Sequence, residues 1–221
     1  GATVSPPAAS RTFIGVNIDH TDDGGTGGTF TFSSEGIGTA AADRRIVVVV
    51  ASSGNTNPVM TSMTVGGISS TLVVNRGTHN RLCEMWITAV PTGTTGDIVI
   101  VMAQTSMTYC QIGVYALYFL QSSTPIDTEA FSIPTGTNVD FPELSTSANG
   151  VAIWFIANSG GAVTFTWEDP TAVEDFDQLT GAPEGACMGG ASIATTGAAL
   201  TEDATISSSQ ANSKAVCASF R

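Results

Sequence analysis

The residues best suited to chemistry in this 221-residue chain lie in one short segment, "NIDHTDDGGTGG". Asp19, Asp22 and Asp23 carry the carboxylate oxygens that calcium prefers, and His20 is separately a candidate transition-metal ligand or catalytic residue. In an EF-hand loop that starts at Asp19, the twelfth position would be Phe30, where a bidentate glutamate is required. We therefore expect a solvated turn between two strands, with no bound metal and no cofactor. A calcium loop of another type, with the three aspartates as ligands, is the alternative.

Catalytic constellations are otherwise sparse. The two histidines, His20 and His79, both lie in polar, loop-like segments, and neither G-x-S-x-G nor H-E-x-x-H occurs. The acidic segment "TWEDPTAVEDFD" (166–177) could provide paired carboxylates for glycoside hydrolysis, with Glu168 and Asp175 as candidates. Its charges fit better a solvated acidic rim on an edge strand, where they oppose aggregation. We expect no catalytic residues and a protein that is not an enzyme.

A third segment resembles a nucleotide-binding motif. "GIGTAA" (36–41) matches G-x-G-x-x-A, a dinucleotide-binding fingerprint. That motif needs a helix to follow it, because the helix N-terminus binds the pyrophosphate. Here the strand-like run "DRRIVVVV" follows within a few residues, so the match is coincidental.

The composition bounds the class of protein. The chain has 7 Lys and Arg against 19 Asp and Glu, a net charge of −12, and only 12 % of its residues are charged. So acidic a chain has no basic face for nucleic-acid phosphates and is repelled by anionic lipid. The longest apolar run, "RIVVVVA", is far shorter than the roughly 20 residues that span a bilayer. We expect neither nucleic acid nor membrane as a partner.

The residue pattern predicts an all-β fold, a single antiparallel β-sandwich of jelly-roll type with little or no helix. Val, Ile, Thr and Phe alternate with turns rich in Gly, Pro, Asn and Asp, and no segment keeps helical periodicity for three turns. We expect an extended arm over 1–10, because Pro6-Pro7 excludes helix and central strand, and one sandwich domain over 11–221. The expected strands are 11–18, 28–34, 44–52, 59–65, 68–75, 81–90, 96–103, 109–120, 150–158, 162–167, 172–179, 186–193 and 214–220.

Some strands show which faces they bury. In "RLCEMWITAV" (81–90) the odd positions are apolar, which predicts that Glu84 and Thr88 point outward. "RIVVVVA", "YALYFL" and "VAIWFIA" are apolar at both parities, which predicts sheet centres buried on both faces. The Gly66-Gly67 pair between two β-rich runs predicts a two-residue hairpin turn.

The remaining distinctive side chains fit a packed core. Cys83, Cys110, Cys187 and Cys217 are scattered among apolar neighbours without any C-x-x-C pair, so we expect buried free thiols. The three tryptophans close or lie within β runs, which favours core packing over a platform for sugar stacking.

The sequence contains one weak internal repeat, and both of its copies are rich in turn-forming residues. "PTGTTGD" (91–97) and "PTGTNVD" (134–140) share P-T-G-T-x-x-D. Proline presets φ, glycine permits positive φ and aspartate caps a turn, so we expect two similar corners at one end of the sandwich. A shared binding loop is the alternative.

Several phrases resemble a family of β-rich structural proteins of tailed bacteriophages and prophages. They run in order through most of residues 40–220 and include "DRRIVVVVAS", "MTSMTVGGISSTLV", "WITAVPTGTTGDIVIVMA", "GGAVTFTW" and "GAALTEDATISSSQANSKAVCASF". These are strand and turn phrases without catalytic signatures. The resemblance implies a virion component built as a β-sandwich.

From this resemblance we expect an auxiliary capsid decoration or cement protein on the outer surface of the head. Its partners would be the major capsid protein or other virion proteins, with further copies in a homo-oligomer and the Pro-rich arm as a tether. The acidic composition suits the outside of a particle better than contact with packaged DNA. A tail or fibre component is the alternative within this class. Outside it, the alternative is a module that binds carbohydrate or a host-surface glycan.

Overall fold

The computed structural model describes residues 5–19, 28–54, 57–104, 107–158, 161–168, 172–179, 186–211 and 213–221. These residues form β-strands joined by turns and contain no helix, which confirms the predicted all-β fold. It follows that no described helix is long and apolar enough to cross a membrane. Residues 5–9 have no regular secondary structure, and β1 begins at Ser10.

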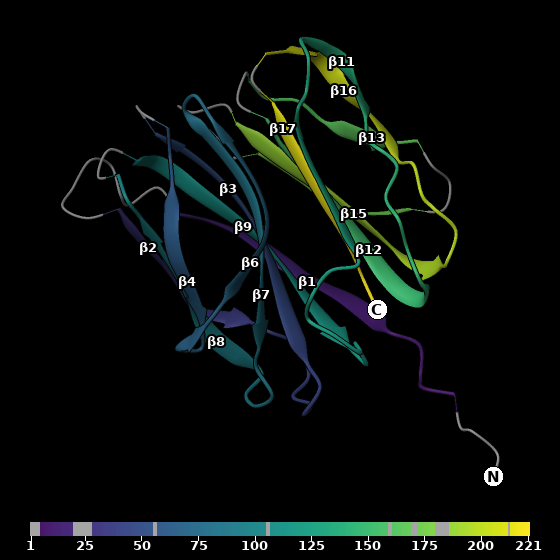
Figure 1. The fold of residues 1–221 in the computed structure, drawn as a ribbon. Helices are drawn as coiled ribbons and strands as arrows, with labels where there is room; N and C mark the ends of the chain where they lie inside the picture. Colours follow the sequence, from purple (N-terminus) through teal and green to yellow (C-terminus); the bar gives the residue numbers. More distant parts are fainter. Residues whose placement is uncertain are drawn as a thin grey trace.

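The strands of residues 10–118 pair into two antiparallel sheets (Figure 1). The N-terminal inner sheet has the order β1 (Ser10–Asp19), β9 (Met107–Tyr118), β3 (Arg45–Gly54), β7 (Arg81–Ala89) and β6 (Thr71–Thr78). The N-terminal outer sheet has the order β2 (Thr29–Gly36), β8 (Thr95–Met102), β4 (Met60–Val65) and β5 (Ile68–Ser69).

Residues 127–220 repeat this arrangement. The C-terminal inner sheet has the order β10 (Asp127–Ser132), β17 (Lys214–Phe220), β12 (Ala148–Asn158), β15 (Cys187–Thr196) and β14 (Val173–Leu179). The C-terminal outer sheet has the order β11 (Gly136–Asp140), β16 (Asp203–Gln210) and β13 (Phe165–Trp167).

The two halves have the same strand order when β5 and β6 are taken as one strand interrupted at Ser70. In each half the inner sheet holds the first, eighth, third, sixth and fifth strands, and the outer sheet holds the second, seventh and fourth. This is the strand order of a jelly roll, except that the fifth strand, apart from the short β5, pairs with the sixth in the inner sheet instead of with the fourth in the outer sheet. The sheet pairing thus refines the expected single sandwich into two stacked sandwiches of the same topology.

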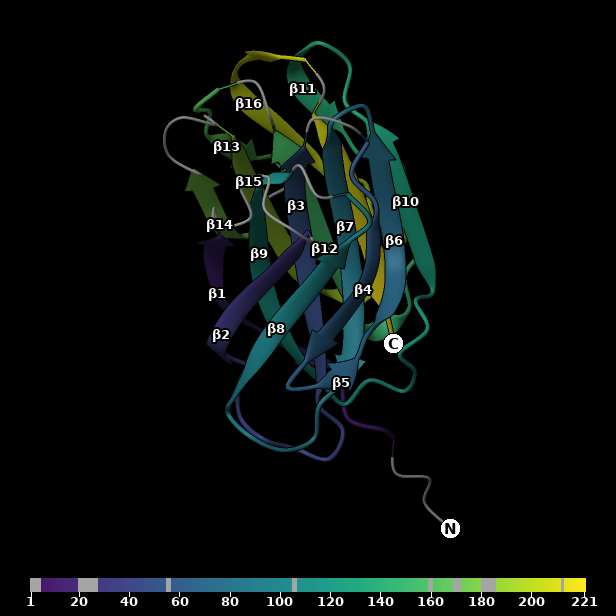
Figure 2. The same cartoon turned by 90° about the vertical axis from the view of Figure 1, so that its left-hand side faces the viewer.

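The two inner sheets face each other, and each outer sheet covers the far side of its own half (Figures 1 and 2). Across the seam β1 lies against β12 and β14, while β6 lies against β10 and β17. The first strand of each half therefore packs on the fifth strand of the other. Such reciprocal contacts are those of a two-fold symmetric dimer, formed here within one chain.

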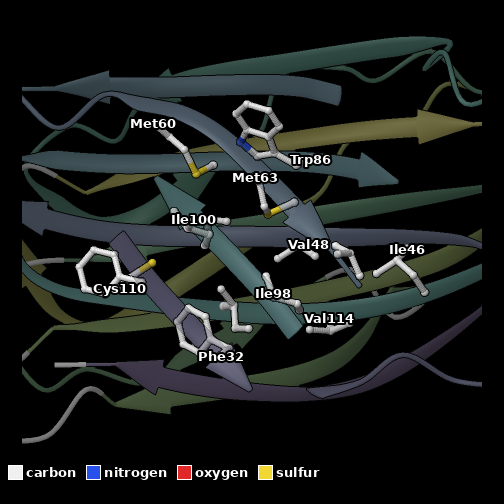
Figure 3. Close-up of a cluster of buried hydrophobic side chains, with 14 of the residues drawn as sticks. Phe32, Ile46, Val48, Met60, Met63, Trp86, Ile98, Ile100, Cys110 and Val114 are labelled. Carbon is white, nitrogen blue, oxygen red and sulfur yellow. The ribbon is translucent and has the colours of Figure 1, made fainter. Parts of the chain in front are cut away.

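Four layers of sheet enclose three apolar cores, one between each pair of neighbouring layers. Alternate side chains of β3 enter different cores. Ile46 and Val48 (Figure 3) enter the N-terminal outer core together with Val50, whereas Val47 and Val49 enter the central core between the halves. Strand β12 divides its side chains in the same way between the central core and the C-terminal outer core. This arrangement confirms the prediction that strands apolar at both parities are buried on both faces.

A phenylalanine from one half fits against glycines of both. A Cβ at Gly113 of β9 would lie 2.9 Å from the Phe176 ring, and a Cβ at Gly190 of β15 would lie 2.4 Å from it. Phe176 also stacks on Phe13 of β1, with ring centroids 5.1 Å apart. Small residues here let aromatic rings fill the central core where the sheets come close.

Two predictions about individual strands need correction. Glu84 and Thr88 do not point into solvent: they are 4 % and 2 % exposed, because the N-terminal outer sheet covers that face of β7. The strands β10, β11 and β16 were not predicted, since "DTEAFS", "GTNVD" and "DATISSSQ" lack a continuous apolar pattern. The predicted hairpin is confirmed, with φ of 57° at Gly66 and 77° at Gly67.

The two ends of the molecule differ. At one end, called the arm end, Asn149 O accepts hydrogen bonds from Ala9 N (2.9 Å) and from Arg221 Nη1 (3.1 Å). The arm residues 5–9 leave the body there (Figures 1 and 2). The opposite end, called the loop end, is where the strands β1, β3, β6, β8, β10, β12, β14 and β16 end.

Candidate functional site

Two of the side chains that the sequence marks as candidates, Asp19 and His79, lie at the loop end. Asp19 is the last residue of β1 and is paired with Cys110 of β9. His79 lies in the β6–β7 turn, where its φ of 59° is that of a left-handed turn residue. Asp22, Asp23 and His20 lie outside the described residues.

The structure therefore bears on only one of the three proposed calcium ligands. Within the described ranges no group of three or more His, Cys, Asp and Glu side chains is arranged to hold a metal ion. The absence of metal at the Asp19–Asp23 loop stays a prediction.

An open hollow of about 580 Å³ lies at the β10–β11 corner of the loop end. It is lined by Phe131, Ser132, Asn138 and Asp140 together with the turn residues Pro134–Thr137, so one aromatic residue, one acid and one amide are among its lining. This hollow contains the second P-T-G-T-x-x-D segment. The first follows β7 at the arm end, so the expectation of two corners at one end is wrong. The repeated sequence therefore reflects the same turn-forming residues at two separate turns, and the two segments do not form a shared loop.

Three of the seven basic side chains gather beside that corner. Arg76 donates to Ser132 Oγ from Nη2 (3.1 Å) and from Nε (3.3 Å), which joins β6 to β10 across the seam. Lys214 is paired with Ser132 and is only 2 % exposed. Burial, together with the positive charges of Arg76 and Arg81, lowers the pKa of Lys214.

At the opposite edge of the seam, a serine hydroxyl connects an arginine to a carboxylate. Arg11 donates from Nε to Ser192 Oγ (2.6 Å) and from Nη2 to Ser192 O (2.8 Å). The Ser192 hydroxyl in turn donates to Asp175 Oδ2 at 2.6 Å. Burial raises the pKa of Asp175, and its bonds with Ser192 and the charge of Arg11 oppose that rise. A cation, a hydroxyl and a carboxylate thus link β1 to β14 and β15.

These contacts disperse the acidic segment that could have formed a hydrolase site. Glu168 follows β13 and its backbone N donates to Asp203 O at 2.9 Å. Asp175 is engaged at the seam, and Asp177 accepts a 3.1 Å hydrogen bond from Phe165 N. Strand β14 is an edge strand, as its charges predict. The carboxylates of Asp175 and Asp177 thus each accept a hydrogen bond from a neighbouring strand, β15 and β13 respectively.

Two buried acids were not predicted, Glu84 in the N-terminal outer core and Glu202 just before β16. Trp86 Nε1 donates to Glu84 Oε2 at 2.6 Å. The i, i+2 spacing of the two residues was the available clue, because it places them on one face of a strand. This pair lies among the buried thioethers of Met60 and Met63, whose positions relative to Trp86 are seen in Figure 3.

The other marked side chains pack as predicted. All four cysteines are buried free thiols. None of the tryptophans is exposed: Trp86 and Trp154 are buried, and the half-buried Trp167 stacks on Phe141 with centroids 6.0 Å apart.

No protein-family model and no curated protein matches the sequence. Among solved structures, a conserved protein of unknown function from Pseudomonas aeruginosa aligns with 88 % of this chain and 76 % of its own, at 12 % identity and a TM-score of 0.26. A turret protein of Sulfolobus turreted icosahedral virus aligns with 96 % of this chain and 98 % of its own, at 13 % identity and a TM-score of 0.17. At such low TM-scores neither structure informs the function.

Proposed function

We propose that this chain is a structural protein of a bacteriophage virion, an auxiliary decoration or cement protein on the outer surface of the head. The observation that supports this proposal best is that the interior of the protein is packed with apolar side chains. Two jelly-roll sandwiches and their seam are filled by three apolar cores, and Arg11 and Arg76 join strands across the seam. A rigid body of this kind suits a building block, and jelly rolls are common in viral capsids.

The distribution of charge supports an outward position. Arg44 is fully buried and donates three hydrogen bonds of 2.7 Å to backbone carbonyl oxygens, those of Gly38, Val90 and Thr92. Arg11 and Arg76 are engaged at the seam, so basic side chains largely serve internal contacts. With a net charge of −12, the surface would be repelled by packaged DNA.

The arm end is the side that we assign to the capsid lattice. The arm and the last residues of β17 converge there, and the loop end then faces the surroundings. Binding would bury apolar and main-chain polar surface across junctions between capsomers.

Immunogold labelling of intact particles tests this assignment. The particles would be purified from cells that carry the genome encoding this chain, and labelled with antibody against the purified protein. Gold on the heads supports the proposal. Gold confined to tails would show a tail or fibre component and overturn the decoration assignment, and particles without label would overturn a virion role.

One observation favours a second candidate, a glycan-binding module. The open hollow at the β10–β11 corner lies at the loop end, where Asn138 and Asp140 offer an amide and a carboxylate to a sugar. A glycan array, run with and without chelator, tests this function. Binding that Asn138→Ala weakens at least tenfold supports it, and an array without any bound glycan rejects it.

A further inference from the structure

A second hollow, of about 600 Å³, lies at the arm end on the N-terminal half. Ser10 and Thr12 of β1 form one side of it, Gly38 and Thr39 form another, and Tyr118 and Phe119 stand at the end of β9. The size is typical of ligand sites, roughly 300–1,000 Å³. We call this place the Phe119 hollow.

The backbone at Phe119 is held in a costly conformation. Its φ is 60°, a left-handed value that is uncommon for an aromatic residue, and the side chain is 49 % exposed. Asp43 Oδ2 fixes this conformation by accepting a 2.6 Å hydrogen bond from Phe119 N. Next to it, the Tyr118 hydroxyl donates to Thr39 O at 2.9 Å. Local strain that keeps an aromatic ring at the rim of a hollow is a feature of binding sites rather than of packing.

The arm starts at the rim of this hollow but runs away from it. Ser10 lines the hollow, and the residue before it, Ala9, donates to Asn149 O of the C-terminal half. From there residues 5–8 are exposed and extend away from the body (Figures 1 and 2). Their path leads off the other half, so this copy's own arm does not occupy its Phe119 hollow.

We propose that the Phe119 hollow binds arm residues 5–8 of a second copy of this chain, while Ala9 of that copy stays packed on its own C-terminal half. The arm "SPPAA" carries Pro6-Pro7, which favours the extended polyproline II conformation. Such segments dock in grooves lined by aromatic rings, and Tyr118 and Phe119 supply two rings. The occupant is uncharged, in keeping with lining residues that carry no ionisable group other than Tyr118.

The arm and the hollow meet at Ser10, so one copy offers both parts of the contact at one end. Two copies can exchange arms reciprocally, or each can pass its arm to the next along a lattice. This inference goes beyond the proposed function, because it concerns contacts between copies and needs no capsid.

Light scattering coupled to size-exclusion chromatography tests the contact on the full chain. The weight-average mass of the wild type should rise above the 22.6 kDa of one chain as concentration increases. Phe119→Asn should stay at the mass of one chain yet keep its fold, since asparagine tolerates positive φ. The double variant Pro6→Ala, Pro7→Ala should also stay monomeric. Val173→Asn, which removes another exposed apolar side chain (56 % exposed), should associate like the wild type.

A peptide of residues 1–10, GATVSPPAAS, provides the second measurement. Titrated into the isotope-labelled double proline variant, whose own arm should not compete, it should shift the amide signals of Thr39, Tyr118 and Phe119. In Phe119→Asn its affinity should fall at least tenfold. A wild type that is monomeric at every concentration, association that survives both sets of substitutions, or a peptide that shifts no signal at the hollow would each overturn the inference. None of these outcomes depends on whether the chain decorates a capsid.

Discussion

Trp86 Nε1 and Glu84 Oε2 lie 2.6 Å apart inside the N-terminal outer core, joined by a hydrogen bond between two side chains of β7. The carboxyl group of Glu84 is almost completely buried, at 4 % exposure. Burial raises the pKa of Glu84 from 4.5 to about 7, and the bond from Trp86 opposes the rise. The N-terminal outer core therefore contains a group that titrates near neutral pH.

Glu84 should make the stability of the fold depend on pH. Its folded-state pKa is higher than its unfolded value of 4.5, so folding favours the protonated acid. Stability from this group is complete below pH 4.5, falls as pH rises and is lost above about pH 7. The full difference corresponds to about 3 kcal/mol. When urea unfolding is measured at pH 4.5 and at pH 8, the unfolding free energy of Glu84→Gln relative to the wild type should be higher at pH 8 by up to about 3 kcal/mol.

Glu143→Gln is the matched control, because Glu143 is exposed. It should follow the pH profile of the wild type. A parallel profile for Glu84→Gln, offset by a constant free energy, would show that Glu84 is not the titrating group.

Gly190 should tolerate no side chain. A Cβ there would lie 2.4 Å from Phe176 Cε1 and 2.8 Å from the Tyr115 hydroxyl, within the central core. Gly190→Ala should therefore destabilise the fold by about 1–3 kcal/mol in chemical denaturation, since a packed core accommodates added volume poorly. Gly15→Ala, in strand β1, has nothing within 4 Å of the added Cβ and should change stability by less than about 0.5 kcal/mol. Equal effects at both positions would contradict the packing described for the seam.

Arg11 and Asp175 should be energetically coupled through Ser192. Each is only about half buried, so we expect a coupling energy of about 1 kcal/mol from a double-mutant cycle with Arg11→Met and Asp175→Asn. Arg76→Met lies at the opposite edge of the seam and should be additive with Asp175→Asn. A coupling to Arg76 as large as that to Arg11 would refute a local network.

The four thiols should be inert in the native protein. Burial raises the pKa of Cys83, Cys110, Cys187 and Cys217, and alkylation requires an accessible thiolate. Mass spectrometry after maleimide treatment should find no label in buffer and four labels in denaturant. One thiol that reacts in buffer would show a gap in the packing of its core.

Much of the fold follows from local pattern. Runs that are apolar at both parities, such as Ile46–Ala51, predict strands with a sheet on either side, and the structure places β3 between two cores. The Gly66-Gly67 turn was also predictable, because a type I′ hairpin turn needs positive φ at both of its central positions.

The division into two halves was not predictable in this way. Alternation tells which face of a strand is buried but not which sheet covers it, and Arg11 meets Ser192 across 181 positions of sequence. The same limit explains the error at Glu84, whose polar side chain suggested solvent although β4 and β5 cover β7. Candidate sites that depend on such distant contacts, including the Phe119 hollow, become visible only in three dimensions.

Cryo-electron microscopy of the particles encoded with this chain would locate it on the virion. We expect density for two stacked sandwiches on the outside of the head, with the arm end toward the lattice and the loop end outward. A head surface that lacks this density, or the chain found inside the shell beside DNA, would contradict this expectation.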